Sequence, residues 1–246
     1  MTNTEIQVFP DLDELSRAAA EEFASLAQTS SSPSKPFAAA LSGGSTPQRF
    51  YELLATPECS SKIPWPRVHL FQVDERCVPP DDPRSNYRMM REAMLERIPS
   101  AHFHRMAAEE PDRDAASARY AAEIRQILGA GSEEWPRFGV IYLGMGDDGH
   151  TASLFPDTAA LTERQLAVCP NYVAKLSMYR LTLTLPVLNA AKRVIFLVSG
   201  AGKAEMLRQV LRTPRSASPQ YPAQLVQPES GAVAWYLDKA AAAGLG

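Results

Sequence analysis

The sequence predicts an α/β protein with a parallel sheet that carries helices on both of its faces. Short apolar runs of strand length alternate along the 246 residues with longer amphipathic runs of helix length. Such alternation is typical of βαβ units, whose strands run parallel. The connecting segments are short and we find no internal repeat. We therefore expect one domain spanning residues 1–246.

The composition excludes several classes of function. The chain is 45% hydrophobic and 22% charged with a net charge of -3, so it lacks the basic excess of a surface for nucleic acid or anionic membranes. No apolar run reaches the ~20 residues of a membrane span, and the first residues do not resemble a signal peptide. The cysteines, Cys59, Cys77 and Cys169, are odd in number and widely spaced, which fits a reducing compartment without a zinc site. We expect a cytoplasmic protein.

The first elements predicted from the sequence are a strand, a helix, a loop and a second strand. A short strand at 6–9 precedes Asp11 and Glu14, which resemble a capping box that begins a helix reaching about residue 28. Residues 29–36 are rich in Ser and Pro and are predicted to form a surface loop. The next apolar run, 37–41, is predicted to be a strand.

A glycine- and hydroxyl-rich turn follows that strand. We expect Thr46 to be the N-cap and Pro47 the first residue of the next helix. A turn that leads into a helix presents free N–H groups and the positive end of the helix dipole, which together bind anions such as phosphate. The alternative is a well-capped loop with nothing bound. The phosphate candidates are Ser42, Gly43, Gly44, Ser45 and Thr46.

The strand expected at 68–73 ends in the charged sequence Asp74-Glu75-Arg76. Ligand sites of α/β proteins lie at the carboxyl ends of strands, although a solvated charge cluster is a fair alternative. Ser85 is predicted to cap a helix from 86 to about 98. A further helix at 114–128 ends at Gly129, and a buried strand at 138–143 follows. We interpret His102 and His104 as ordinary residues, because no nearby residues complete a metal-ligand set.

The most distinctive stretch follows the strand at 138–143. Gly144, Gly146 and Gly149 indicate a tightly turning backbone, and His150 is a natural proton carrier near neutral pH. The glycine spacing matches the dinucleotide fingerprint, but no long helix is expected after it and no acid ends a strand ~20 residues later. A purely structural histidine is the other alternative.

The last third of the chain repeats the strand–turn–helix pattern. Strands are expected at 180–185, 193–198 and 231–237, with a short helix at 186–192. The sequence from Ser199 to Lys203 makes a second possible phosphate contact, although it lacks the P-loop spacing. Residues 212–222 are predicted to form a loop, and Asp238 to begin a terminal helix.

Five motifs together resemble the 6-phosphogluconolactonase family over nearly the whole chain. They are Ser42-Gly-Gly-Ser-Thr-Pro47, Asp74-Glu-Arg76 with Ser85-Asn-Tyr87, the stretch from Gly144 to Pro156, Arg180-Leu-Thr-Leu-Thr-Leu-Pro186 and Ser199-Gly-Ala-Gly-Lys-Ala204. The most specific part is Gly149-His-Thr-Ala-Ser-Leu-Phe-Pro156. The related glucosamine-6-phosphate deaminases share the first loop but carry a different sequence after the histidine.

The resemblance implies a three-layer α/β/α sandwich with a mostly parallel, Rossmann-like sheet. It also implies hydrolysis of 6-phosphogluconolactone, a sugar-phosphate lactone, in the oxidative pentose phosphate pathway. The family uses no nicotinamide cofactor and no catalytic metal. We expect no nucleic-acid or membrane partner, and a monomer or weak homodimer.

The resemblance and the chemistry of lactone hydrolysis assign roles to particular residues. His150 is expected to be the general base on water, with Asp148 orienting it and Asp74 near the sugar ring. The loop from Ser42 to Thr46 is expected to hold the phosphate. Its charged partners are Arg180 and Lys203, whereas Arg76 serves either the phosphate or the carbonyl oxygen.

Three other functions remain alternatives. An isomerising deaminase of amino-sugar phosphates would share the fold and the phosphate loop. A sugar-phosphate sensor without catalysis would keep the phosphate contacts and tolerate the loss of His150. A nicotinamide dehydrogenase would bind the dinucleotide, which the residues around His150 disfavour.

Overall fold

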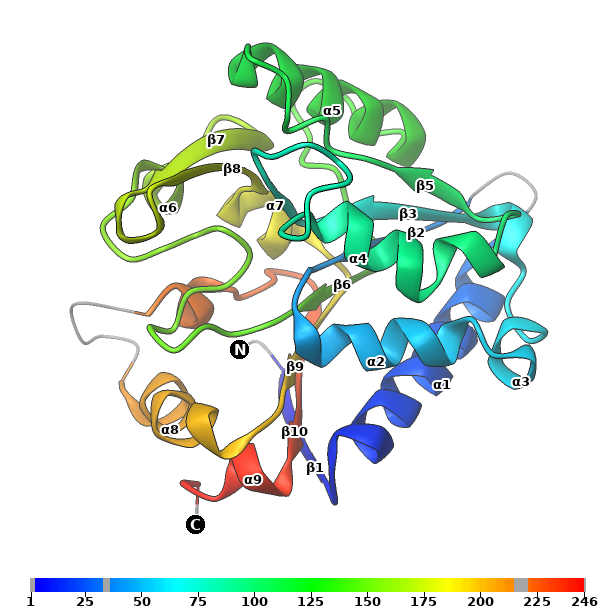
Figure 1. Ribbon diagram of the computed structural model, residues 1–246, viewed down its shortest axis with the longest axis vertical. Helices are drawn as coiled ribbons and strands as arrows, with labels where there is room; N and C mark the ends of the chain where they lie inside the picture. Colours follow the sequence, from blue (N-terminus) through cyan, green and yellow to red (C-terminus); the bar gives the residue numbers. More distant parts are fainter. Residues whose placement is uncertain (1–2, 33–35, 215–220, 246) are drawn as a thin grey trace.

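The largest sheet of the protein is wholly parallel. The computed structural model describes residues 3–32, 36–214 and 221–245. Seven strands pair in the order β1-β10-β9-β6-β2-β3-β5 (Figure 1). The strands are β1 (Asn3–Phe9), β2 (Phe37–Leu41), β3 (Val68–Gln72), β5 (His102–His104), β6 (Val140–Leu143), β9 (Arg193–Val198) and β10 (Ala232–Asp238).

Helices cover both faces of this sheet. Because side chains alternate along a strand, Ala39 and Leu41 of β2 pack into one apolar core while Ala38 and Ala40 pack into the other. The first core also contains α1 (Leu12–Ser30), α2 (Ser45–Leu54) and α4 (Asn86–Ala93). The second contains residues of α5 (Arg113–Leu128), α7 (Leu185–Ala190) and α8 (Ala204–Arg212), together with Ala160 of α6 (Ala159–Thr162) and Ala241 of α9 (Lys239–Ala242). The short helix α3 (Pro57–Ser60) packs against the first core through Cys59. The predicted three-layer α/β/α class is confirmed.

A second, antiparallel sheet lies beside the main one. It consists of β4 (Asp74–Arg76), β8 (Met178–Leu183) and β7 (Val168–Val173) in the order β4-β8-β7. The expected strand at 68–73 forms as β3, one residue shorter, and the charged sequence that follows it forms the separate strand β4, which was not expected. Val73 joins the sheets, because its N–H donates to Leu41 of β2 at 2.9 Å and its carbonyl accepts from Leu183 of β8 at 2.8 Å.

The strand expected at 180–185 forms as β8, but it pairs in this small sheet and not in the parallel one. Its partner β7 was not expected, since Pro170 and Asn171 interrupt its apolar pattern. The short strand β5, which contains His102 and His104, was not expected either.

The start of α2 differs from the prediction. Helix α2 begins at Ser45 with Gly44 as its N-cap, so the assignment of Thr46 to the N-cap and Pro47 to the first helical position is wrong. Gly44 has φ of 110°, which a glycine adopts without strain and which turns the chain into the helix two residues earlier than predicted. Pro47 is still tolerated, because N–H groups in the first turn have no intrahelical partner.

Other boundaries differ slightly. Helix α1 extends to Ser30, so it takes two residues of the stretch predicted as a loop, and residues 33–35 of that stretch lie outside the described residues. Helix α4 ends at Ala93, and a 3-10 turn, Leu95–Arg97, replaces the rest of the expected helix. Part of the loop expected at 212–222 also lies outside the described residues. No helix in the described ranges is both long and apolar enough to cross a bilayer.

Candidate active site

The candidate site lies where the order of the parallel strands reverses. From β2 the chain proceeds to β3 and β5 in one direction, and from β6 it proceeds to β9 and β10 in the other. The switch point is thus between β2 and β6, where ligands of open α/β sheets bind. A cavity of about 230 Å³ opens there. Its lining comprises Ser42, Gly43, Gly44, Ser45, Thr46, Pro47, Asp74, Arg76, Asn86, Gly144, Met145, Gly146, His150, Thr151, Ala152, Arg180, Leu197, Val198, Ser199 and Lys203.

The loop after β6 holds an imidazole–carboxylate pair. His150 Nδ1 lies 2.5 Å from Asp148 Oδ1, and the same oxygen accepts the backbone N–H of His150 at 3.1 Å. Burial alone would raise the pKa of Asp148, but hydrogen bonds from His150 and Lys175 outweigh it and hold that pKa well below its usual range. Asp148 is therefore a carboxylate. It accepts the proton of Nδ1, which leaves the lone pair on Nε2.

Packing fixes the ring of His150 from two sides. A Cβ at Gly146 would lie 1.9 Å from His150 Nδ1, so only glycine lets the imidazole approach that closely. The other face stacks on Phe155, with ring centroids 3.9 Å apart. Asp148 does not line the cavity and contacts the Nδ1 side of the ring. The other ring nitrogen, Nε2, has no hydrogen-bond partner in the described part of the chain.

The loop after β2 presents free hydrogen-bond donors at the cavity. It enters α2 through Gly44, whose positive φ leaves the first N–H groups of a ten-residue helix at the cavity. Among the described residues, the buried hydroxyl of Ser42 has no hydrogen-bond partner, while Tyr51 donates to the Ser42 carbonyl at 2.6 Å. These free donors fit a phosphate group.

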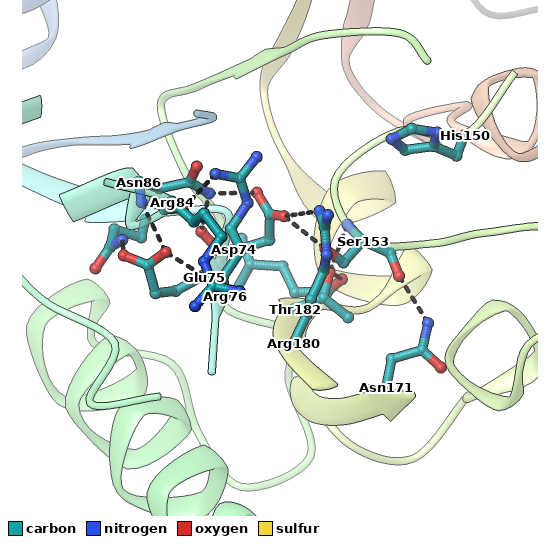
Figure 2. Close-up of polar contacts among 12 residues, drawn as sticks. Asp74, Glu75, Arg76, Arg84, Asn86, His150, Ser153, Asn171, Arg180 and Thr182 are labelled. Carbon is teal, nitrogen blue, oxygen red and sulfur yellow. Dashed lines mark hydrogen bonds and ion pairs between the residues drawn. The ribbon is translucent and has the colours of Figure 1, made fainter. Parts of the chain in front are cut away.

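Asp74 also lines the cavity, where its side chain belongs to a network of hydrogen bonds (Figure 2). Its Oδ2 accepts from Ser153 Oγ at 2.6 Å, and Asn86 Nδ2 donates to its backbone carbonyl at 2.9 Å. Arg180 Nη1 lies 3.8 Å from the same carboxylate. Figure 2 shows the His150 ring directed toward the side of the site where Asp74 and Arg76 lie.

Arg76 and Arg180 are neighbours in the small sheet. They are directly opposite each other in the register of β4 and β8, so their side chains project from the same face. Arg76 donates to the carbonyl of Arg84 at 2.6 Å, and the Nε of each guanidinium is buried without a partner in the part of the chain that the structure describes. Burial lowers the pKa of Arg180, an effect that Asp74 opposes and Arg76 reinforces. This pair suits an anionic or developing negative charge.

Glu75 serves the scaffold and not the cavity. Its carboxylate accepts from Gln72 Nε2, the hydroxyl of Ser85 and the backbone N–H groups of Arg76, Asn86 and Tyr87, at 2.7–3.0 Å. It thereby fixes the start of α4, and Asn86 at that start touches both Asp74 and the loop after β2. A Cβ at Gly43 would lie 1.8 Å from Asn86 Oδ1.

Lys203 enters the cavity from the loop after β9. It pairs with Asp147, whose side chain is 84% exposed, so its ammonium can exchange that partner for a ligand. The turn before it is held by Asp238, which accepts from Ser199 Oγ at 2.5 Å and from Gly200 N at 3.0 Å. The cations of the site come from two parts of the fold. Lys203 comes from the turn after β9, and the two arginines come from β4 and β8 of the small sheet.

The glycines of the loop after β6 do not form a dinucleotide-binding turn. The chain after Gly149 forms turns, and the next helix, α6, has only four residues and begins at Ala159. A dinucleotide fingerprint requires a helix that opens at the glycines. Across the described ranges, no group of three or more His, Cys, Asp and Glu side chains is placed to hold a metal ion.

The structure brings all the predicted site residues except Asp148 to the wall of one cavity, and it places Asp148 against His150. Sequence reasoning missed Lys175, for which no motif gave a signal, and gave no role to Ser153 and Asn86. Both of the latter stand inside motifs that the sequence marked, so the signal was present for them.

Comparisons with known proteins agree with this geometry. The family model described as glucosamine-6-phosphate isomerases/6-phosphogluconolactonase matches residues 10–235. A Nostoc protein named 6-phosphogluconolactonase is 38% identical over 98% of both chains. A human protein of the same name is 40% identical over 96% of this chain and 92% of its own.

Solved structures give the same result. The crystal structure titled devB protein superposes with a TM-score of 0.90 at 35% identity, covering 99% of this chain and all of the other. The 6-phosphogluconolactonase from Leishmania guyanensis superposes with a TM-score of 0.87 at 27% identity, covering 99% of both chains. The chain therefore belongs to the glucosamine-6-phosphate isomerase/6-phosphogluconolactonase family.

Proposed function

We infer that this protein is a lactone hydrolase that converts 6-phosphogluconolactone to 6-phosphogluconate, the second step of the oxidative pentose phosphate pathway. The names of its full-length relatives support this activity. The observation that carries the mechanism is the pairing of His150 with Asp148 beside a loop of free phosphate donors.

We propose that His150 activates water for attack on the lactone carbonyl. Because Asp148 accepts the Nδ1 proton, the lone pair of Nε2 is free to take a proton from water. The hydroxide adds to the carbonyl carbon and gives a tetrahedral oxyanion. A positioned base of this kind contributes about 10²- to 10⁴-fold.

The ring opens in the second step. The oxyanion re-forms the carbonyl and breaks the bond between the former carbonyl carbon and the ring oxygen. The imidazolium of His150 returns its proton to that leaving alkoxide, so the histidine ends as it began. Ser153 is not the nucleophile, because its hydroxyl is fully buried and donates to Asp74.

Phosphate binding orients the substrate. We propose that Gly43, Gly44, Ser45, Thr46 and the Ser42 hydroxyl hold the phosphate, with Lys203 and Arg180 supplying charge. Fixing the phosphate away from the reacting carbon places the carbonyl near Nε2 and lowers the entropic cost of the reaction.

The remaining polar groups face the sugar. We propose that Asp74 binds hydroxyls of the sugar ring or assists the proton transfer, since Ser153 and Asn86 hold its carboxylate in place. Arg76 is placed to stabilise either the phosphate or the oxyanion. A carbonyl oxygen that gains charge in the transition state benefits most from such a donor.

We propose that the enzyme acts in the cytoplasm as a monomer or weak homodimer. Its cysteines are all free thiols, which suits a reducing compartment.

The test is the rate of lactone opening with purified protein, using lactone generated in place from glucose 6-phosphate. The spontaneous rate is subtracted. We expect a large acceleration, and no release of ammonia from glucosamine 6-phosphate. Ammonia release without lactone opening would favour the deaminase, and binding of 6-phosphogluconate without either reaction would favour a sensor.

A further inference from the structure

Lys175 reaches the imidazole–carboxylate pair from a distant part of the chain. It lies at the tip of the β7–β8 hairpin, in the 3-10 turn Ala174–Leu176. Ser177 follows with φ of 48°, in the left-handed region that non-glycine residues seldom adopt, and turns the chain into β8. The hairpin thus carries a lysine from the small sheet to the loop after β6.

Two contacts join Lys175 to the surroundings of His150. Its ammonium bonds Asp148 Oδ2, while His150 occupies the other oxygen, Oδ1. The same ammonium lies 4.8 Å from the centroid of the Phe155 ring, which stacks on His150. Lys175 therefore touches both groups that hold the imidazole.

We propose that Lys175 is a positioning residue for the His150–Asp148 pair and sets the pH range in which His150 acts as a base. The proposal rests on the proposed function, in which His150 is the general base. Lys175 does not line the cavity, so it acts through Asp148 and Phe155 and not on the substrate.

The first effect is geometric. A carboxylate bonded through one oxygen can rotate about its Cβ–Cγ bond and lose alignment with the imidazole. With Oδ1 bonded to His150 and Oδ2 bonded to Lys175, that rotation would break one charge-assisted bond. The orientation of the ring then depends on Lys175 as well as on Asp148.

The second effect is electrostatic. A carboxylate next to His150 favours the protonated imidazolium, which is no longer a base, and a cation on the same carboxylate opposes this. Other charged groups around the His150 ring are Arg180, whose Cζ lies 5.3 Å from the centroid of the Phe155 ring, and the Lys203–Asp147 ion pair. Loss of Lys175 removes the cation bonded to Asp148 and leaves the full charge of that carboxylate beside His150. Activity that depends on His150 as a base is then expected to appear only at higher pH.

A plain surface ion pair would behave differently. The side chain of Lys175 is 52% exposed, and exposed ion pairs contribute little to stability. If Lys175 only bridged the surface, its removal would leave the pH profile unmoved. The pH profile therefore separates the two roles.

The experiment compares Lys175→Met, Lys175→Arg and a control, Lys239→Met. Lys239 is also exposed, but it lies in α9 and does not line the cavity. The profile of kcat/KM against pH is measured for each. We expect Lys175→Met to shift the acidic limb upward by about half to one pH unit, with KM little changed. Lys175→Arg is expected to restore the profile, and Lys239→Met to match the wild type.

The NMR signals of the His150 ring report its environment without turnover. We expect these signals to shift in Lys175→Met and to return toward the wild-type positions in Lys175→Arg. An unshifted pH profile with unshifted ring signals in Lys175→Met would overturn the proposal, as would a uniform loss of activity at every pH that Lys175→Arg does not repair. Lack of acceleration by the wild type would overturn the proposed function instead, and the NMR shift would still report on Lys175.

Discussion

Ser153 Oγ donates a hydrogen bond of 2.6 Å to Asp74 Oδ2, and this bond joins the loop that carries His150 to the strand that carries Asp74. Asn171 Nδ2 fixes the same serine by donating to its carbonyl at 2.8 Å (Figure 2). The two walls of the cavity are thus held in register by a fully buried hydroxyl.

Replacing Ser153 by alanine is expected to destabilise the protein by about 1–3 kcal/mol, because the buried carboxylate of Asp74 loses its shortest hydrogen bond. Denaturant unfolding measures the change. Ser16→Ala is the matched control, since the Ser16 hydroxyl is equally buried but has no partner within residues 3–32, 36–214 and 221–245. Equal stability of the two variants would contradict the assigned role of the Ser153 hydroxyl.

Gly146→Ala is expected to lower kcat about 100-fold, because its Cβ would meet His150 Nδ1 at 1.9 Å and push the ring out of alignment. Circular dichroism checks that the fold is kept. In Gly202→Ala the new Cβ has no atom within 4 Å, so that variant is expected to retain wild-type kcat. A fully active Gly146→Ala enzyme would show that the position of the ring is not limiting.

Lys203→Met is expected to raise KM for the phosphorylated lactone by about 10- to 100-fold, the cost of one charged hydrogen bond to phosphate. Turnover of gluconolactone, which has no phosphate, is expected to change little. Lys62→Met, on the surface outside the cavity, serves as the control. An equal effect of Lys203→Met on both lactones would place Lys203 away from the phosphate.

Acid is expected to destabilise the edge of the sheet at β5. The rings of His69, His102 and His104 stack there, with His69 Nδ1 2.9 Å from His104 Nε2. Burial and the two neighbouring histidines lower the pKa of His69 from 6.5 to about 4. The unfolded chain therefore binds a proton at a pH where the folded chain does not.

Acid therefore lowers the free energy of unfolding through His69. The contribution of His69 to the free energy of unfolding is fully present above pH 6.5 and is lost as the pH falls from 6.5 toward 4. His69→Gln is expected to flatten that part of the stability curve, which urea unfolding at several pH values measures. Parallel curves for the variant and the wild type would rule out this origin of the slope.

The sequence predicted the parallel sheet and most of the cavity, because both depend on local signals. Apolar runs such as 37–41 and 193–198 match their strands residue for residue. Turns rich in glycine at the ends of β2, β6 and β9 indicated a ligand site, since parallel strands bring their carboxyl ends to one edge, whereas the strand order that makes this edge a switch point came from the structure.

The features that sequence reasoning missed depend on contacts between distant segments. The alternating pattern of β8 predicts a strand but not which strand it pairs with, so the small antiparallel sheet was not foreseen. Lys175 looks like an ordinary surface lysine until the hairpin brings it to Asp148. Glu75 carries the same charge as Asp74, yet the alternation of side chains along β4 turns it toward the scaffold.

The most direct test of the account measures turnover and ligand binding together in His150→Ala. Turnover is followed on 6-phosphogluconolactone above the spontaneous rate, and binding of 6-phosphogluconate is measured by calorimetry. We expect kcat of His150→Ala to fall by about 10²- to 10⁴-fold, while the Kd of the product changes by less than about threefold. Retained turnover, or an equal loss of turnover and binding, would contradict the role of His150 as the general base.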